Sequence, residues 1–415
     1  MKSEKILEPE VRKSKAFLTI GMNKRNIRLF YYSQIAYGLS TCIFDMLYSL
    51  HLTGLGISDP NIGTLFFIGF LAMAILVLPL GSLADRISPN GGMWFSSLGF
   101  GITMLLIPFI TSYSGQIIAF VLASVFSAVM LTTSTGVMAR HTPDERERLG
   151  VFQIGFLMFL ISSALGAVIG GWLVEVLPKG NTSYQWALIV SGIIGIFIGL
   201  FRIILVIMYP LSPIENMKKP KVKSQIKVKN YKPAILMLVL AALVGAFSVL
   251  GIRFSTIILV NHFKLPVTDM GILVSIDKIL SILGIVVLAR YIKSGKEAKI
   301  AGILMIVVLP LQIVGAFSST AIAFAIPFLL TRGLYYSQAP ILDWVTNHIA
   351  TDDHRTFMNS IERLGLFVGS ALGSQLYGSL LQPHFSFTMV CAGIFAGLAG
   401  IIYWIFSNMI TKKTT

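Results

Sequence analysis

Long apolar runs follow one another along almost the whole chain, and only short polar segments separate them. Each run is long enough for a helix that crosses a bilayer. The runs lack the alternation of lipid-facing and lumen-facing residues that is typical of strands in a membrane barrel. Since lipid offers no hydrogen bonds to an exposed backbone, the runs are predicted to be helices. Twelve spans are expected, at residues 27–53, 61–80, 92–112, 115–138, 149–177, 184–209, 232–260, 267–289, 298–316, 319–342, 357–381 and 386–408.

The composition agrees with an all-α membrane protein and excludes several other classes. Of the 415 residues, 55% are hydrophobic and 12% are charged, against about 25% charged residues in soluble domains. Such a chain cannot hide its apolar surface from water, which excludes a soluble enzyme, a disordered chain and a secreted disulfide scaffold. The two cysteines, Cys42 and Cys391, lie inside apolar runs, so no disulfide framework and no metal site is expected. No phosphate-binding glycine loop occurs, and no cofactor is expected.

The basic residues predict the orientation in the membrane. The net charge is +15. With a cytoplasmic N-terminus, 26 lysines and arginines fall on inside segments and two, Lys179 and Lys264, fall outside. This bias predicts a multi-pass protein of the plasma membrane with both termini in the cytoplasm. The basic residues lie between spans rather than on one aromatic-rich face, so nucleic acid is not expected as a partner. The segment 218–229 is expected to bind anionic lipid headgroups.

An internal repeat divides the chain into two sets of six spans. The longest polar stretch after the N-terminus, residues 210–231, separates the sets. Residues 51–63 align with 259–271 at an offset of 208, and residues 142–146 align with 351–355 at an offset of 209. Parallel repeats of this kind hold their substrate near the midplane between them. The expected organisation is a cytoplasmic segment 1–26, a six-helix bundle 27–209, a cytoplasmic loop 210–231, a second bundle 232–408 and a cytoplasmic tail 409–415.

The loop after the second span carries a family resemblance. Gly81, Asp85 and Arg86 match the glycine and the Asp-Arg pair of the signature of the major facilitator superfamily, whereas residues 88–90 lack its basic tail. The resemblance implies two pseudo-symmetric six-helix bundles, with these three residues as a conformational latch in which Asp85 contacts the start of the eleventh helix. The alternative is a solvated loop pair. Residues 166–171 resemble the antiporter signature of drug exporters, with Ala167 where proline is expected, although such small residues also serve close helix packing.

Ionisable residues inside the spans are the candidate site, because charge in lipid is costly unless it faces a partner or water. Asp45 in the first span and Arg253 in the seventh stand at equivalent positions of the repeat. They are predicted to meet across a central cavity, as a gate or substrate pair, or alternatively as a salt bridge that serves assembly alone. A polar stripe on one face of the first span is expected to line water; it consists of Gln34, Gly38, Thr41, Asp45 and Tyr48.

Further charges fall in the later spans. Asp277 and Lys278 are adjacent, point about 100° apart on a helix, and are expected to have separate partners. Arg332 and Tyr336 share a face of the tenth span. Glu362 and Arg363 begin the eleventh span, where they either face the cavity or snorkel to the interface. Arg202 is interpreted as a snorkelling residue without a role.

The sequence therefore predicts a secondary transporter that works by alternating access, as a monomer, with proton-coupled efflux of a small organic or amphiphilic solute. Either buried acid could carry the coupling proton, and sodium is the alternative ion. A slight excess of buried bases favours a carboxylate or phosphate on the substrate, so an importer of a small organic anion remains open. A membrane-embedded transferase and a non-transporting receptor are the alternatives from other classes.

Overall fold

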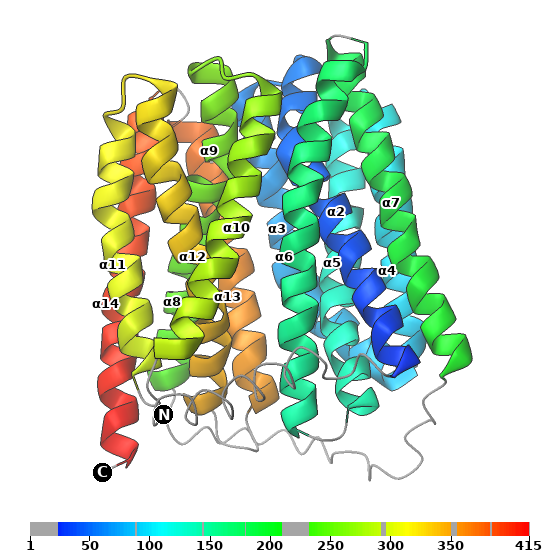
Figure 1. Ribbon diagram of the computed structural model, residues 1–415, viewed down its shortest axis with the longest axis vertical. Coiled ribbons are helices and arrows are strands. Elements are labelled where there is room, and N and C mark those ends of the chain that lie inside the picture. The colour runs from blue at the N-terminus through cyan, green and yellow to red at the C-terminus, as the bar shows by residue number, and fades with distance from the viewer. Residues whose placement is uncertain are drawn as a thin grey trace, which may run out of the picture.

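The computed structural model describes residues 24–87, 89–142, 145–178, 180–209, 232–291, 296–349, 355–381 and 384–414, and within them it contains helices and no strand. The helices stand side by side (Figure 1). The first part of the chain forms α2 (Arg25–Gly54), α3 (Asp59–Ile87), α4 (Pro89–Leu106) with the 3-10 turn η1 (Ile107–Phe109), α5 (Tyr113–His141), α6 (Glu145–Val176) and α7 (Asn181–Met208). The second part forms α8 (Lys232–Phe247), η2 (Ser248–Arg253), α9 (Phe254–Ile257), η3 (Ile258–His262), α10 (Val267–Tyr291), α11 (Glu297–Ala316), α12 (Ala321–Ile349), α13 (Arg355–Leu376), η5 (Tyr377–Leu381) and α14 (Phe385–Thr414).

Nine helical segments of the described chain are long and apolar enough to cross a membrane. The continuous segment from α8 to η3 is one of them. The long helices without such a window are α2, α12 and α13, which carry Asp45, Arg332 and Glu362 respectively. Polar residues at the predicted site therefore lower the hydropathy of the helices that hold them. The protein is a multi-pass, all-helical membrane protein.

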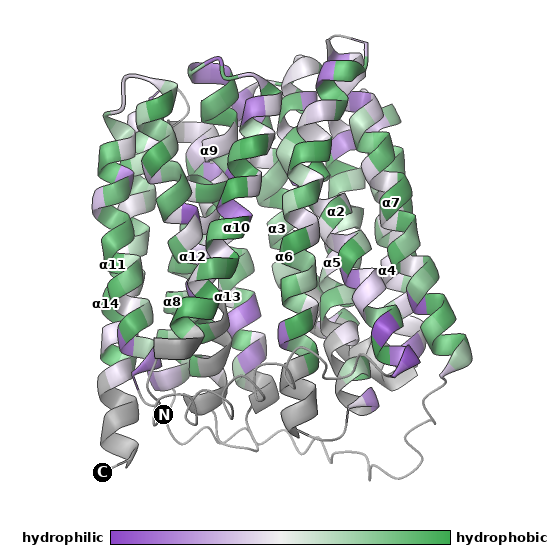
Figure 2. Cartoon of the chain, viewed as in Figure 1, coloured by the Kyte–Doolittle hydropathy of each residue, from purple (hydrophilic) through white to green (hydrophobic). Residues whose placement is uncertain are grey.

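Large apolar side chains cover the outside of the molecule. Ile118, Ile207 and Ile322 are more than half exposed, although a protein in water tends to bury isoleucine. The apolar colour runs along most of the length of α7 and α11, and hydrophilic positions are frequent toward the helix ends (Figure 2). This surface is suited to lipid.

The helix packing of residues 25–208, called here the N-terminal half, is repeated by residues 232–414, the C-terminal half. In the first, α2 packs on α6 and α7, α4 on α5 and α7, and α3 on α5. In the second, α8 packs on α13 and α14, α11 on α12 and α14, and α10 on α12. Each contact in one half has its counterpart in the other.

The repeat extends to individual hydrogen bonds. Ser163 Oγ donates to the carbonyl of Gly38 over 3.3 Å, and Ser370 Oγ donates to the carbonyl of Gly245 over 3.3 Å. Both bonds join residues 125 apart in sequence. A Cβ at either glycine would collide with a carbonyl of the facing helix. Glycine at these positions lets α2 approach α6, and α8 approach α13, at backbone distance.

The two halves meet closely at the end opposite to that where α2 begins and α14 ends, called here the far end (Figure 1). There α6 packs on α10 and α3 packs on α13 and η5. A Cβ on Gly63 would stand 2.6 Å from the Cα of Gly378. The hydroxyl of Thr268 donates to Glu175 Oε2 over 2.8 Å. Contacts of main chain on main chain therefore join the halves at this end.

The small residues 166–171 of α6 take part in close packing. Gly170 lies against Met46 of α2, and Gly171 lies against the backbone of Thr268 on α10. On the other side of the same contact, Gly271 lies against the carbonyl of Ala167. The packing role that small residues commonly have in membrane helices accounts for this segment.

Candidate functional site

An ion pair joins the two halves, about two-thirds of the way along α2 toward the far end. Arg253 Nη2 donates to Asp45 Oδ1 over 2.7 Å. The Asp45 side chain is 55% exposed and the Arg253 side chain 20%. The guanidinium also lies over the rings of Phe66 and Phe70 on α3, at 4.7 and 5.5 Å from their centres. Arg253 thus contacts the N-terminal half by charge and by cation–π attraction, while the exposed carboxylate of Asp45 requires a polar surrounding.

Aromatic rings pack next to this pair on the side of the far end. Phe254 stacks on Tyr377 with ring centres 3.6 Å apart, and Phe66 meets Phe254 edge to face at 6.0 Å. These rings come from α9, η5 and α3 and so from both halves. The ion pair therefore lies next to packed aromatic rings that both halves contribute, called here the aromatic layer.

Irregular backbone presents Arg253 to the N-terminal half. Two π-helical turns, η2 and η3, interrupt the seventh long helical segment, and Arg253 ends the first of them. Turns of this kind are rare and occur frequently at functional sites, because they re-aim side chains and loosen the regular hydrogen-bond ladder. The carbonyl of Ile252 in η2 accepts two side-chain bonds, from Ser255 Oγ and from Arg332 Nη1, each at 2.8 Å.

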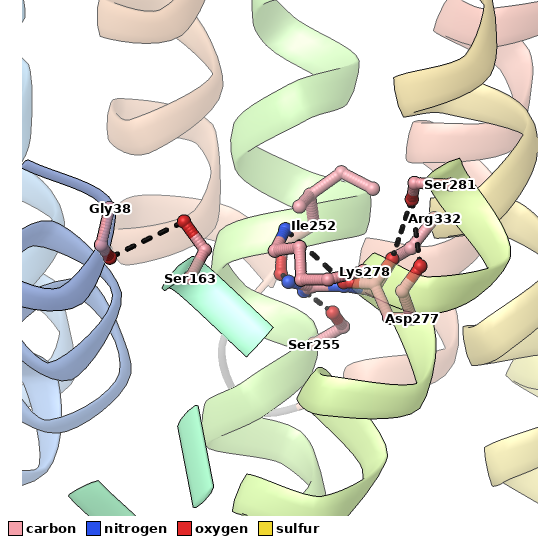
Figure 3. Close-up of polar contacts among 8 residues, drawn as sticks. All are labelled: Gly38, Ser163, Ile252, Ser255, Asp277, Lys278, Ser281 and Arg332. Atoms are coloured by element: carbon pink, nitrogen blue, oxygen red, sulfur yellow. Dashed lines mark hydrogen bonds and ion pairs between the residues drawn. The ribbon is translucent and has the colours of Figure 1, made fainter. Parts of the chain in front are cut away.

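A second charge cluster lies buried in the C-terminal half (Figure 3). Asp277 is fully buried; its Oδ2 accepts from Arg332 Nε over 2.8 Å and lies 3.3 Å from Lys278 Nζ. Ser281 Oγ contacts Asp277 Oδ1 at 3.4 Å. The ammonium of Lys278 also lies 3.6 Å from the ring centre of Tyr336. One carboxylate is thus shared by two buried cations.

The expectation of separate partners for Asp277 and Lys278 was wrong. The Cβ atoms of helix neighbours diverge, but the four-carbon stem of lysine is long and flexible enough to return its ammonium to the adjacent carboxylate. The ion pair of Arg332 with Asp277 joins α12 to α10, so the cluster lies between these two helices.

The two clusters are connected through the main chain. Arg332 binds Asp277 with Nε and the carbonyl of Ile252 with Nη1. The next residue after Ile252 is Arg253, the partner of Asp45. Two hydrogen bonds and one peptide unit therefore connect Asp277 with the ion pair between the halves.

The remaining residues of the predicted stripe on α2 do not all line water. Gln34 lines a cavity in the N-terminal half, and Thr41 donates to the carbonyl of Tyr37 over 2.7 Å. Tyr48 is buried, with its hydroxyl donating to Gln116 Oε1 over 2.9 Å. Gly38 is buried against α6. The prediction of a water-lined face was wrong for Gly38 and Tyr48, because polar or small residues on one face also serve helix packing.

Glu362 and Arg363 separate in space. Glu362 is buried and its Oε2 accepts from Thr346 Oγ1 of α12 over 2.6 Å, which excludes the interface for this residue. Arg363 is exposed. Gly81, Asp85 and Arg86 belong to α3 by their backbone, but their side chains lie outside the described part, so the latch stays a prediction. The segment 218–229 lies outside the described residues as well.

Arg202 is the functional candidate that sequence reasoning missed. Its side chain is 2% exposed and contacts the hydroxyls of three serines, Ser33, Ser97 and Ser134, on three other helices. The prediction that Arg202 snorkels was wrong, because α7 turns this position toward the other helices and not toward lipid. The serines in three other spans were the sequence feature that could have suggested buried partners for Arg202. This indication is weak, because serine in a membrane helix commonly donates to its own backbone.

No group of three or more histidine, cysteine or carboxylate side chains that could hold a metal ion occurs in the described ranges. What the arrangement offers is ionisable groups placed between helices at mid-depth of a multi-pass protein. Such groups mark pathways for solutes and ions. The fold and the site together define a membrane transporter and not an enzyme.

The chain belongs to the Major Facilitator Superfamily, whose family model matches residues 30–350. In sequence, it is 29% identical over 105 residues to the multidrug efflux pump LfrA of Mycolicibacterium smegmatis, and this match covers 25% of the chain and 21% of that protein. Transporters of this family bind small-molecule substrates.

Solved structures share the fold. A bacterial homologue of the human lysosomal transporter Spinster, inward-facing and occupied, superposes with a TM-score of 0.70 at 13% identity and covers 92% of this chain and 96% of its own. A bacterial homologue of the iron transporter ferroportin, inward-facing, reaches 0.70 at 14% identity, with 92% and 98% covered. A mutant of the nucleoside transporter NupG reaches 0.68 at 16% identity, with 92% and 99% covered.

Proposed function

We propose that the protein is a secondary active transporter that exports a small organic or amphiphilic solute in exchange for protons, by alternating access. The observation that carries the proposal is the ion pair of Asp45 and Arg253, which joins the halves beside an aromatic layer while more than half of the Asp45 side chain stays exposed. An exposed acid at mid-depth can exchange a proton, and an arginine from the opposite half competes with that proton.

The proposed architecture is twelve spans in two six-helix bundles, residues 27–209 and 232–408, with both termini in the cytoplasm of a plasma-membrane protein. Helices α2, α12 and α13 would complete the twelve. Their low hydropathy is what a span lining a polar pathway needs, and the repeated packing of the halves supports the two bundles. With cytoplasmic termini the far end faces outside, so the halves are joined on the outer side.

The proposed coupling is a competition at Asp45. When Asp45 is ionised, Arg253 binds it and holds the halves together. Protonation of Asp45, or a solute that takes its place at Arg253, removes one attraction between the halves and permits their separation. The buried cluster at Asp277 biases the same switch, since Arg332 bonds to the peptide next to Arg253.

Export is proposed because the curated relative is called a multidrug efflux pump. The second candidate is an importer of a small organic anion. The observation that favours it is the pair of buried cations, Arg332 and Lys278, on the single carboxylate of Asp277. This excess of positive charge would attract a carboxylate or phosphate.

The test uses purified protein in sealed vesicles that contain a pH-sensitive dye. A library of organic solutes is added, and the dye reports proton movement that a solute induces. The wild type is expected to move protons in response to at least one solute, and to accumulate that solute when a proton gradient is imposed. Asp45→Asn is expected to abolish proton-driven accumulation and to retain exchange of labelled solute for unlabelled solute.

Asp269→Asn is the matched control, because it removes a carboxylate from the first turn of α10 at the far end. It is expected to keep proton-driven accumulation. Undiminished proton coupling in Asp45→Asn would contradict the proposal. If accumulation depended on a sodium gradient and not on a proton gradient, sodium would be the coupling ion, and the proposal of a secondary transporter would stand.

A further inference from the structure

Arg202 of α7 lies in the interior of the N-terminal half, at the depth of the first turns of α2. Its Nε contacts Ser33 Oγ at 3.4 Å, and its Nη1 donates to Ser97 Oγ over 2.8 Å and to Ser134 Oγ over 2.7 Å. These serines belong to α2, α4 and α5. The guanidinium is therefore held in place from three sides.

The serines solvate the cation without neutralising it. Each hydroxyl donates its proton to a carbonyl of its own helix: Ser33 to Phe30, Ser97 to Met93 and Ser134 to Met130. Only lone pairs remain for Arg202. Within the described part of the chain, the hydrogen bonds of Arg202 run from Nε and Nη1 to serine hydroxyls, and no carboxylate pairs with it there. A buried cation without a counter-charge is costly, so an anion that reaches it gains attraction in a setting of low dielectric.

A cavity of about 210 Å³ lies beside the guanidinium. Arg202, Ser134 and Gln34 supply its polar wall, while aromatic rings supply most of the rest, with Gly155 leaving room between them. The rings are those of Phe30, Tyr37, Phe152 and Phe156. Ligand sites combine a mostly apolar lining with a few polar groups in this way.

We propose that Arg202 is an anion-binding subsite, which holds the carboxylate or phosphate of a soluble organic anion whose aromatic or apolar body occupies this cavity. Nη2 takes part in none of the three serine contacts, and a planar guanidinium fits the two oxygens of such a group. As a subsite for the transported solute, the inference rests on the proposed function, and it narrows the solute to organic acids and phosphate esters.

The probe is benzoate, compared with benzamide, its neutral analogue of the same shape. The midpoint of thermal unfolding of the purified full chain in detergent is measured against ligand concentration. Benzoate is expected to raise the midpoint saturably and benzamide is not. Arg202→Gln is expected to weaken benzoate binding about tenfold or more, because a hydrogen bond to a charged group is lost together with the charge.

Lys299→Gln is the matched control, since it removes one positive charge from an exposed position on α11 near Trp404, in the other half. Its benzoate affinity is expected to equal that of the wild type. If Arg202→Gln does not fold, Gly155→Leu replaces it: this variant retains the arginine, fills the cavity and is expected to lose benzoate binding. Unchanged benzoate binding in the folded variant, or equal stabilisation by benzamide, would overturn the proposal.

A lipid headgroup carries the same anionic chemistry, so binding is repeated in nanodiscs. Equal benzoate affinity in phosphatidylcholine and in phosphatidylglycerol supports a soluble anion. Loss of benzoate binding in phosphatidylglycerol nanodiscs alone would indicate that a lipid headgroup occupies the site, and it would overturn the proposal of a soluble anion. The benzoate-binding measurement needs no ion gradient, so a negative result would not bear on proton coupling at Asp45. Conversely, a loss of the proposed proton coupling would not change the benzoate-binding result.

Discussion

Each half of the protein buries an arginine, and the two halves surround it differently. In the C-terminal half, Arg332 is paired with the fully buried carboxylate of Asp277. In the N-terminal half, Arg202 is surrounded by neutral serine hydroxyls beside a cavity. The first arrangement compensates its charge within the protein, whereas the second holds the cation by neutral hydroxyls, with no carboxylate partner in the described part of the chain. Burial of an arginine alone therefore does not indicate its role.

Matching positions of the internal repeat also differ in charge between the two halves. At an offset of 208, the places of Asp277, Lys278 and Arg332 are taken in the N-terminal half by Gly69, Phe70 and Ser124. None of these carries a charge, and a Cβ on Gly69 would meet Phe120 and Ser124. Helix packing is shared by the halves, but the charges inside them are not. The two halves thus carry different buried charges on a similar arrangement of helices.

The largest effect is expected at Asp277. Asp277→Asn leaves Arg332 and Lys278 buried without a carboxylate, which is expected to cost about 3–5 kcal/mol of folding free energy. The midpoint of thermal unfolding of the purified protein, with denaturant titration where unfolding is reversible, measures the loss.

The double variant Asp277→Asn with Lys278→Met is the control for this effect. It removes one of the two orphaned cations and is expected to recover part of the stability. If the double variant were less stable than the single one, charge compensation would not be the reason for the loss.

An intermediate effect is expected at the two glycines that the halves share. Gly38→Ala and Gly245→Ala each place a methyl group against a facing carbonyl, and overpacking of this kind costs about 1–3 kcal/mol. Thermal unfolding should show similar losses for both. Gly397→Ala, whose Cβ would first meet a Leu309 side-chain atom at 3.4 Å, is expected to be tolerated. A loss at one glycine alone would show that the packing is not equivalent in the halves.

The smallest effect on stability is expected at Arg202. Arg202→Met removes hydrogen bonds to Ser97 and Ser134 but also removes an uncompensated buried charge, and each serine keeps its bond to its own helix. The opposing effects leave a net change of about 1 kcal/mol or less. A loss as large as that of Asp277→Asn, in the same unfolding measurement, would indicate that Arg202 is a structural residue and would remove the contrast between the halves.

The candidate site was predictable where the repeat applied. Asp45 and Arg253 were paired on the basis of equal position in two similar halves, and the structure places their side chains 2.7 Å apart. Equivalent residues of two parallel repeats lie at the same depth in the membrane and face the same way relative to the pseudo-symmetry axis. This information is enough to pair two side chains that meet across that axis. The helices themselves followed from hydropathy, closely for α11, which spans Glu297–Ala316 against an expected 298–316, and less closely for α12, which spans Ala321–Ile349 against an expected 319–342.

The partners of the other charges were not predictable in this way. Lys278 turned back on its neighbour Asp277, and Arg202 turned inward to three serines. Side chains of this length reach several directions from one helix position, and the choice among them depends on which groups other helices bring within reach. For Arg202 and Ser134, that choice is made between residues 68 apart in sequence.

The amino-acid sequence by itself determined that this chain crosses a membrane as helices, that its two halves repeat each other, and that an acid and a base occupy matching depths. These follow from transfer of apolar residues into lipid and from the need to satisfy the backbone within each helix. The tertiary structure alone decided which buried charges neutralise each other and which one stands beside a cavity. The reason is that the cost of a buried charge depends on all groups around it in space, and the neighbours of a helix are known only once the helices have packed.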